Sequence, residues 1–83
     1  MTLDEFKKNI APHINKGYVA MDKSGKYFHY RNKPILDNQV WTTNKGNYNE
    51  LSDMFDIEPV DDWTKSLIEV GRWVTLNYIT VIV

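Results

Sequence analysis

The chain lacks cysteine entirely, and its 83 residues include only four glycines and three prolines. Without thiols it has no disulfide bonds and no thiolate–metal sites, which stabilise many small domains. The absence of cysteine also fits a reducing compartment such as the cytoplasm. The length allows one globular domain, residues 1–83, in which the eleven aromatic side chains can supply much of the buried surface.

Long apolar runs are also missing. The first twenty residues contain Asp4, Glu5, Lys7 and Lys8 and no continuous apolar stretch, unlike a secretory signal. The most apolar segment, residues 74–83, is interrupted by polar residues and is shorter than the roughly 20 residues that cross a bilayer. We therefore expect a cytoplasmic protein with no membrane partner.

Catalytic motifs are absent as well. The chain has no nucleophile elbow, no glycine-rich phosphate loop and no His-Glu-x-x-His motif. His13 and His29 are the only histidines, and a metal site needs three or four defined ligands. The acidic residues of the second half lack the spacing of a calcium loop. We expect a non-enzymatic protein with no catalytic residues, no metal and no cofactor.

The net charge of −1 conceals an uneven distribution. Residues 1–47 hold eight basic and four acidic groups, whereas residues 48–69 hold seven acidic groups and one basic group. This balance is not typical of a DNA-binding protein or a DNA mimic. Two interpretations remain open, namely two ordinary solvated surfaces or two opposed charged patches. In the second, the acidic patch includes Asp53, Asp56, Glu58 and Asp61.

The N-terminal segment has the features of a helix. Residues 2–5, Thr-Leu-Asp-Glu, match a capping box. Pro12 removes a backbone donor, so the helix either ends near Ile10 or bends there. Lys16-Gly17 is expected to be its final end. Apolar residues recur three and four positions apart on one helix face: Leu3, Phe6, Ile10 and Ile14.

The middle of the chain has strand and turn composition. Residues 18–21 and 26–31 predict a β-hairpin around the turn 22–25, in which Gly25 can adopt a positive φ. Pro34 ends this ladder. A turn at residues 37–38, a strand at 39–43 and a short strand at 48–51 should follow.

The second half is less regular. Residues 52–62 predict an acidic loop with a few buried apolar anchors, and residues 63–70 a short helix capped by Asp61 or Asp62. Residues 73–83 predict an apolar strand that could pair with its copy in a homodimer. The fold class is α+β, with an N-terminal helix packed on a small antiparallel sheet of four to five strands.

One strand, residues 26–31, interleaves basic and aromatic side chains. Such a strand can stack and neutralise a nucleotide or single-stranded nucleic acid. Alternation puts Tyr27, His29 and Arg31 on one face, exposed if the other face is core. Lys33 and Trp41 could extend this surface. The alternative is an ordinary hairpin with a polar outer face.

Several segments carry a family resemblance. The residues are 20–30, Ala-Met-Asp-Lys-Ser-Gly-Lys-Tyr-Phe-His-Tyr, then Lys33-Pro34, Trp41, and 63–67, Trp-Thr-Lys-Ser-Leu. This pattern resembles small proteins encoded by phages and prophages, over about residues 18–70. The resemblance implies no catalytic residues. It implies an accessory role, in the host cytoplasm, of binding and blocking a host protein such as a defence component.

Two functional hypotheses follow. In the first, the protein inhibits a host protein by stoichiometric occlusion, with a charged patch and exposed aromatic residues as the interface. The second is a nucleotide or single-stranded nucleic-acid binding module. The residues expected to bind in one or the other are Tyr27, His29, Arg31, Lys33, Trp41, Asp53, Asp56, Glu58 and Asp61.

Overall fold

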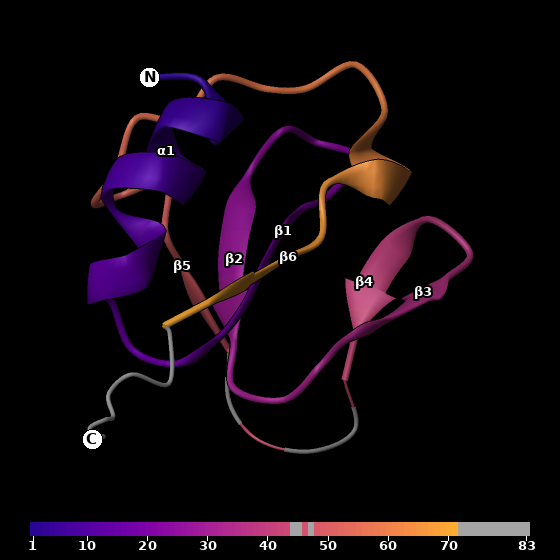
Figure 1. Ribbon diagram of the computed structural model, residues 1–83. Helices are drawn as coiled ribbons and strands as arrows, with labels where there is room; N and C mark the ends of the chain where they lie inside the picture. Colours follow the sequence, from indigo (N-terminus) through magenta and orange to yellow (C-terminus); the bar gives the residue numbers. More distant parts are fainter. Residues whose placement is uncertain (44–45, 47, 72–83) are drawn as a thin grey trace.

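The computed structural model describes residues 1–43, 46 and 48–71, which form one α-helix, two 3₁₀ helices and six strands (Figure 1). In chain order these are α1 (Leu3–Asn9), η1 (Ala11–His13), β1 (Gly17–Met21), β2 (Tyr27–Tyr30), β3 (Ile35–Asp37), β4 (Val40–Thr42), β5 (Tyr48–Glu50), η2 (Trp63–Lys65) and β6 (Ile68–Val70). The main sheet is antiparallel with the order β5-β2-β1-β6, and β3 and β4 form a separate two-stranded sheet. The predicted α+β fold is confirmed.

The hairpin of β1 and β2 is the centre of the main sheet. Its register places Met21 opposite Tyr27 next to the turn. The N–H of Gly25 donates to the carbonyl oxygen of Asp22 at 3.0 Å, and Gly25 has a φ of +95°, which glycine adopts without strain. These features confirm the hairpin and the turn predicted within residues 18–31.

One face of the main sheet packs against α1. Phe6 of α1 is fully buried, and its ring meets the ring of Phe55 edge-on at a centroid distance of 5.6 Å. Val19 and Tyr27 reach the same cluster from β1 and β2. The other buried members are Ala11, Met21, Leu51, Ile57 and Val70.

The opposite face of the sheet is also partly covered. Ala20 and Tyr30 are buried there, although they point away from the face that carries Val19. Figure 1 shows the β3–β4 hairpin on the other side of the sheet from α1. The indole Nε1–H of Trp41 in β4 donates to the carbonyl oxygen of Trp63 at 3.3 Å. This bond ties the β3–β4 hairpin to the rest of the molecule.

The start of α1 confirms the predicted capping box. The backbone N–H of Glu5 donates to Thr2 Oγ1 at 3.1 Å, and the backbone N–H of Thr2 donates to Glu5 Oε1 at 2.8 Å. The hydrogen bonds from Thr2 hold the pKa of the Glu5 carboxyl below its usual value. The cap therefore satisfies backbone donors that a helix start leaves without partners.

The end of α1 resolves the alternative that Pro12 left open. The α-helix ends at Asn9, with Ile10 as its C-cap, and Pro12 lies in the 3₁₀ helix η1. The expected helix end at Lys16-Gly17 is wrong, because Gly17 begins β1. Proline cannot donate the backbone bond that would continue the α-helix.

The β3–β4 hairpin is only partly predicted by the sequence. The turn at residues 37–38 is confirmed, with Asn38 at a φ of +57°, and β4 lies within the predicted strand 39–43. Strand β3 is an addition to the prediction. Three residues directly after Pro34 are too few for a recognisable alternation, and their pairing with β4 defines them as a strand.

The helix predicted for residues 63–70 is wrong. Only η2 is helical there, with Asp62 as the predicted cap, and the Thr64 hydrogen bonds lower the pKa of the Asp62 carboxyl. From Ile68 the chain forms β6, which pairs with β1. The spacing of Trp63 and Val70 fits a helix, but pairing with a distant strand prevails and the β-branched residues of β6 suit it.

The apolar strand expected at residues 73–83, and the homodimer through it, lie outside the described residues.

Ser66, the C-cap of η2, links η2 to β1 from a fully buried position. Its Oγ accepts the N–H of Met21 at 2.8 Å and donates to the carbonyl oxygen of Trp63 at 2.7 Å. Ser52 accepts the N–H of Tyr27 at 3.0 Å, but Ser52 is exposed. Each serine hydroxyl thus accepts a backbone N–H, but Ser66 does so in the protein interior and Ser52 at the solvent-exposed surface.

We expect Ser66→Ala to lower the free energy of unfolding by about 1–3 kcal/mol, because the N–H of Met21 would be buried without an acceptor. Ser52→Ala is the matched control and should cost less, since water can replace its oxygen. Urea unfolding of both variants measures the difference. Equal losses would contradict the role assigned to Ser66.

Candidate functional site

The structure corrects the expected position of Tyr27. Alternation along β2 is as predicted, but the face that carries Tyr27 is the one packed against α1, so its side chain is buried. The hydroxyl of Tyr27 donates to the carbonyl oxygen of Glu58 at 2.9 Å, and burial raises its pKa. Tyr27 is a core residue and offers no exposed stacking surface.

Three of the other residues predicted to bind ligand lie together in a pocket, which we call the basic pocket. It has a volume of about 840 Å³ and is open to solvent. His29, Arg31 and Lys33 line it as expected, and Lys16 adds a further basic group. The remaining lining residues are Asn15, Gly17, Tyr18, Asn32 and Asn49.

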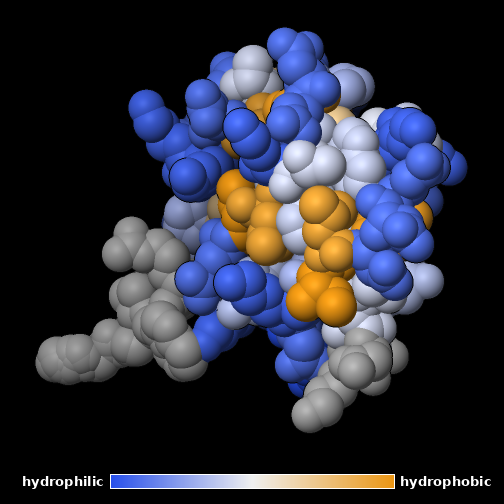
Figure 2. All heavy atoms as spheres, turned by 90° about the vertical axis from the view of Figure 1, so that its right-hand side faces the viewer, coloured by the Kyte–Doolittle hydropathy of each residue, from blue (hydrophilic) through white to orange (hydrophobic). Residues whose placement is uncertain are grey.

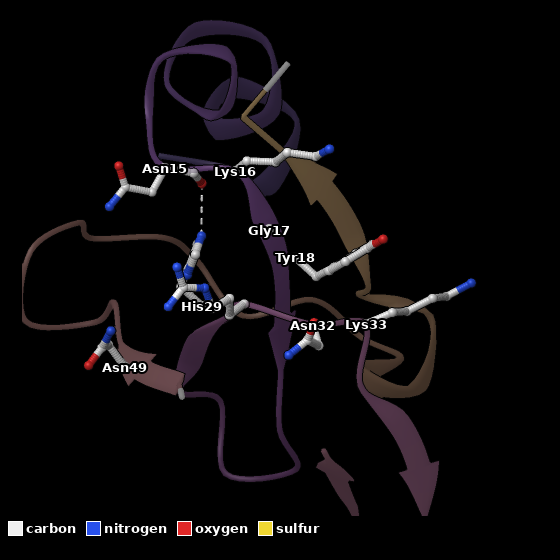
Figure 3. Close-up of a pocket in the computed structure, with 9 residues that line it drawn as sticks. Asn15, Lys16, Gly17, Tyr18, His29, Asn32, Lys33 and Asn49 are labelled. Carbon is white, nitrogen blue, oxygen red and sulfur yellow. Dashed lines mark hydrogen bonds between the residues drawn. The ribbon is translucent and has the colours of Figure 1, made fainter. Parts of the chain in front are cut away.

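His29 is held in a defined orientation in this pocket (Figure 3). Its Nε2 lies 2.9 Å from the carbonyl oxygen of Asn15. Because a carbonyl oxygen only accepts, Nε2 carries the proton and donates. The backbone of Gly17 packs against both the ring and β2, since a Cβ at this position would clash with the carbonyl oxygen of Tyr30 and lie 2.8 Å from His29 Cε1. Glycine is therefore needed where β1 passes the imidazole.

The side chains of the basic pocket extend to two sides of β1. In Figure 3, those of Lys16, Tyr18 and Lys33 extend to one side, whereas those of His29 and Asn49 lie on the other. The strand registers agree, because Val19, His29 and Asn49 share one sheet face and Tyr18 belongs to the other. The pocket therefore surrounds the end of the strand, and its polar groups are spread around it.

The prediction that Trp41 extends this basic surface is wrong, because Trp41 does not line the basic pocket. It lines a second, smaller pocket between the main sheet and the β3–β4 hairpin, with a volume of about 310 Å³. We call this pocket the aromatic groove. Its lining residues are Asp22, Phe28, Tyr30, Val40, Trp41, Thr42, Thr43 and Tyr48.

The sequence alone did not reveal the aromatic groove. Phe28 and Tyr30 come from β2 and Tyr48 from β5, and they meet because the register places Tyr30 opposite Tyr48. The ring of Tyr48 stacks on Tyr30 at 5.8 Å and meets Phe28 edge-on at 5.9 Å. Alternation in β2 does put Phe28 and Tyr30 on one face, but their partner on β5 depends on a long-range pairing.

Apolar side chains are exposed beside the groove. Ile35 is 66% exposed, Leu36 43% and Val40 50%. We call these three residues the hairpin patch, in which Ile35 and Val40 share one face of the hairpin and Leu36 lies on the face of Trp41. Figure 2, which faces the β3–β4 side of the molecule, shows hydrophobic residues gathered there between hydrophilic areas. Exposed apolar clusters of this kind mark interaction surfaces more often than scattered apolar residues do.

The four acidic residues predicted to bind a partner all lie in the loop between β5 and η2. Asp53, Asp56, Glu58 and Asp61 are exposed. This loop passes the Met21 end of β1, where the N–H of Val60 contacts the Met21 sulfur at 3.4 Å. The basic pocket lies at the Gly17 end of the same strand, so the acidic loop and the basic pocket lie near opposite ends of β1.

No protein-family model, curated protein or solved structure matches this chain. Within residues 1–43, 46 and 48–71, no helix has the length and apolar character needed to cross a bilayer. The same residues contain no group of three or more His, Asp or Glu side chains arranged to hold a metal ion. The choice between functions therefore depends on the hairpin patch and the two pockets.

Tyr30, in the wall of the aromatic groove, makes the stability of the protein depend on pH. Burial raises the pKa of Tyr30 to about 12, and the charges of Asp22 and Tyr48 act in the same direction. The unfolded chain loses this phenolic proton near pH 10, before the folded protein does. The contribution of Tyr30 to the free energy of unfolding is therefore fully present below about pH 10 and is lost as the pH rises towards 12.

We expect Tyr30→Phe to flatten the decrease in unfolding free energy between about pH 10 and 12. Part of the decrease in unfolding free energy should remain in this variant, because burial also raises the pKa of Tyr27. Urea unfolding across this pH range measures both profiles. Parallel profiles for the variant and the unmodified protein would show that Tyr30 is not the group involved.

Proposed function

We propose that this protein binds a host protein and blocks it by stoichiometric occlusion, without turnover. The observation that carries the proposal is the exposed hairpin patch beside the aromatic groove. The resemblance to small phage and prophage proteins supports a bacterial host protein, with a defence component as one class, and action in the host cytoplasm.

The composition of this surface supports protein binding. Interfaces gain most of their affinity from a few aromatic and apolar anchors, surrounded by polar groups that exclude water. Ile35 and Val40 supply exposed apolar area, and Tyr48 is 59% exposed at the groove. Burying these side chains against a partner removes apolar surface that the fold itself leaves in water.

The loop with Asp53, Asp56, Glu58 and Asp61 is assigned a supporting role. Exposed charges at the rim of an interface mainly accelerate encounter and contribute little to final affinity. In this proposal the acidic loop attracts a basic surface of the partner, whereas the hairpin patch supplies the close contact.

The test compares a double apolar-to-polar substitution in the hairpin patch with a single control substitution elsewhere. Ile35→Thr with Val40→Thr changes the hairpin patch, and threonine suits a strand. Met54→Thr is the control, because Met54 is 71% exposed and its neighbour Phe55 packs on α1, away from the β3–β4 hairpin (Figure 1). The double variant should weaken partner binding at least about fivefold, equivalent to 1 kcal/mol or more.

Native mass spectrometry of the protein purified gently from bacterial cytosol identifies the retained partner. Titration of that partner then measures the affinity of each variant and the stoichiometry. We expect one partner per chain, saturation at one equivalent, and loss of binding only in the double variant. Turnover of the partner, or equal binding by the double variant, would contradict the proposal.

The basic pocket supports a second function, binding of a nucleotide or single-stranded nucleic acid. Arg31, Lys33 and Lys16 place positive charge around the end of β1, and the lining residues that the structure describes include no carboxylate. Tyr18 takes the stacking role first assigned to Tyr27, which is buried. Phosphate neutralisation by such groups is strongly salt-dependent.

For this second function, Arg31→Ala with Lys33→Ala should weaken binding of a fluorescent oligothymidylate. Loss of two phosphate contacts lowers the slope of log affinity against log salt by about 1.4. Lys7→Ala with Lys8→Ala is the control, since these exposed lysines of α1 change the charge equally. Fluorescence anisotropy at several salt concentrations, with ATP as competitor, measures the effect. Equal slopes for both double variants would exclude the basic pocket as the binding site.

A further inference from the structure

The walls of the aromatic groove combine four aromatic side chains from three strands. Phe28 and Tyr30 belong to β2, Trp41 to β4 and Tyr48 to β5. The rings of Tyr30 and Tyr48 are nearly parallel, with an interplanar angle of 29°, and Phe28 stands at 69° to Tyr48. An aromatic face carries partial negative charge, so converging rings attract a cation placed over them.

The rings are held in place before any ligand arrives. Tyr30 is buried, and Trp41 is fixed by the hydrogen bond from its Nε1–H to the carbonyl oxygen of Trp63. Tyr48 is exposed but rests against both Phe28 and Tyr30. A pre-organised wall reduces the conformational entropy that binding would otherwise cost.

One carboxylate completes the groove. Among the described residues that line the groove, Asp22 is the one that carries a charge. Its Oδ1 accepts hydrogen bonds from the backbone N–H and the hydroxyl of Ser24, which fix the carboxylate at the turn between β1 and β2. Asp22 and Tyr30 line the same groove, and the charge of Asp22 contributes to the raised pKa of Tyr30. Glu50, opposite Phe28 in the register, adds a second acidic group on this sheet face.

We propose that the aromatic groove binds an arginine side chain of the partner protein. The guanidinium group stacks on aromatic faces and pairs with a carboxylate in a planar arrangement, so rings and Asp22 satisfy the same group. The volume of about 310 Å³ suits a single long side chain. This inference rests on the proposed function, because it names the chemical group that the partner inserts beside the hairpin patch.

Charge complementarity selects this occupant over others. A phosphate or carboxylate would face Asp22 directly and be repelled. A purely apolar side chain would remove water from Asp22 without giving it a partner, which is unfavourable. Arginine avoids both costs.

The test uses N-acetyl-arginine methylamide as the probe and N-acetyl-citrulline methylamide as the matched neutral analogue. Titration of the full chain is followed by ¹H–¹⁵N NMR at the indole N–H of Trp41 and the backbone N–H groups of Asp22 and Tyr48. We expect saturable shifts with the arginine probe, and at least about tenfold weaker binding of the citrulline analogue.

Two variants identify the groups responsible. Asp22→Asn retains an oxygen acceptor for Ser24 but removes the charge. This variant should bind the arginine probe about tenfold more weakly. Asp4→Asn makes the same change in α1, on the other side of the sheet from the β3–β4 hairpin, and should have no effect. Tyr48→Leu removes an exposed ring and should also weaken binding, while dispersed NMR spectra verify that each variant is folded.

The outcomes separate this inference from the proposed function. Absence of saturable shifts up to about 50 mM probe, equal binding of both probes, or an unchanged affinity in Asp22→Asn would overturn the arginine site. A partner that is retained through the hairpin patch in that case leaves the proposed function intact. Conversely, selective arginine binding with no dependence of partner binding on the hairpin patch would overturn the proposed function alone.

Discussion

The structure depends on the burial of β1 from both sides. Val19 and Ala20 are adjacent, so they point to opposite faces of the sheet, and both are completely buried. A short chain must therefore cover two faces at once. The helix α1 and the loop after β5 cover one face, and the smaller β3–β4 hairpin covers part of the other. The aromatic groove lies where this second cover is incomplete.

Features set by neighbouring residues were predictable from the sequence. The capping box at Thr2, the turn with Gly25 and the cap at Asp62 each depend on residues only two or three positions apart. Features set by distant pairing were not. Residues 63–70 have the apolar spacing of a helix, but β6 forms because β1 offers an open edge. Likewise, the packing of α1 determines that the sheet face with Tyr27 is the buried one.

The same distinction applies to the candidate sites. The sequence predicts that His29, Arg31 and Lys33 lie together, since His29 lies in β2 and the other two follow directly after this strand. The aromatic groove could not be predicted, because Trp41 and Tyr48 reach it from separate strands. Composition revealed the abundance of aromatic residues, but only the sheet register shows which of them share a wall.

The carbonyl oxygen of Trp63 accepts from three donors, the indole N–H of Trp41 and both the backbone N–H and the hydroxyl of Ser66. Ser66 in turn accepts the N–H of Met21 in the central strand. One oxygen atom therefore joins the β3–β4 hairpin to the core of the sheet. A rotation of the β3–β4 hairpin about Trp41 would therefore disturb the series of hydrogen bonds that runs from Trp41 through Trp63 and Ser66 to Met21 in β1. Force applied at the surface is thus transmitted to the most deeply buried strand.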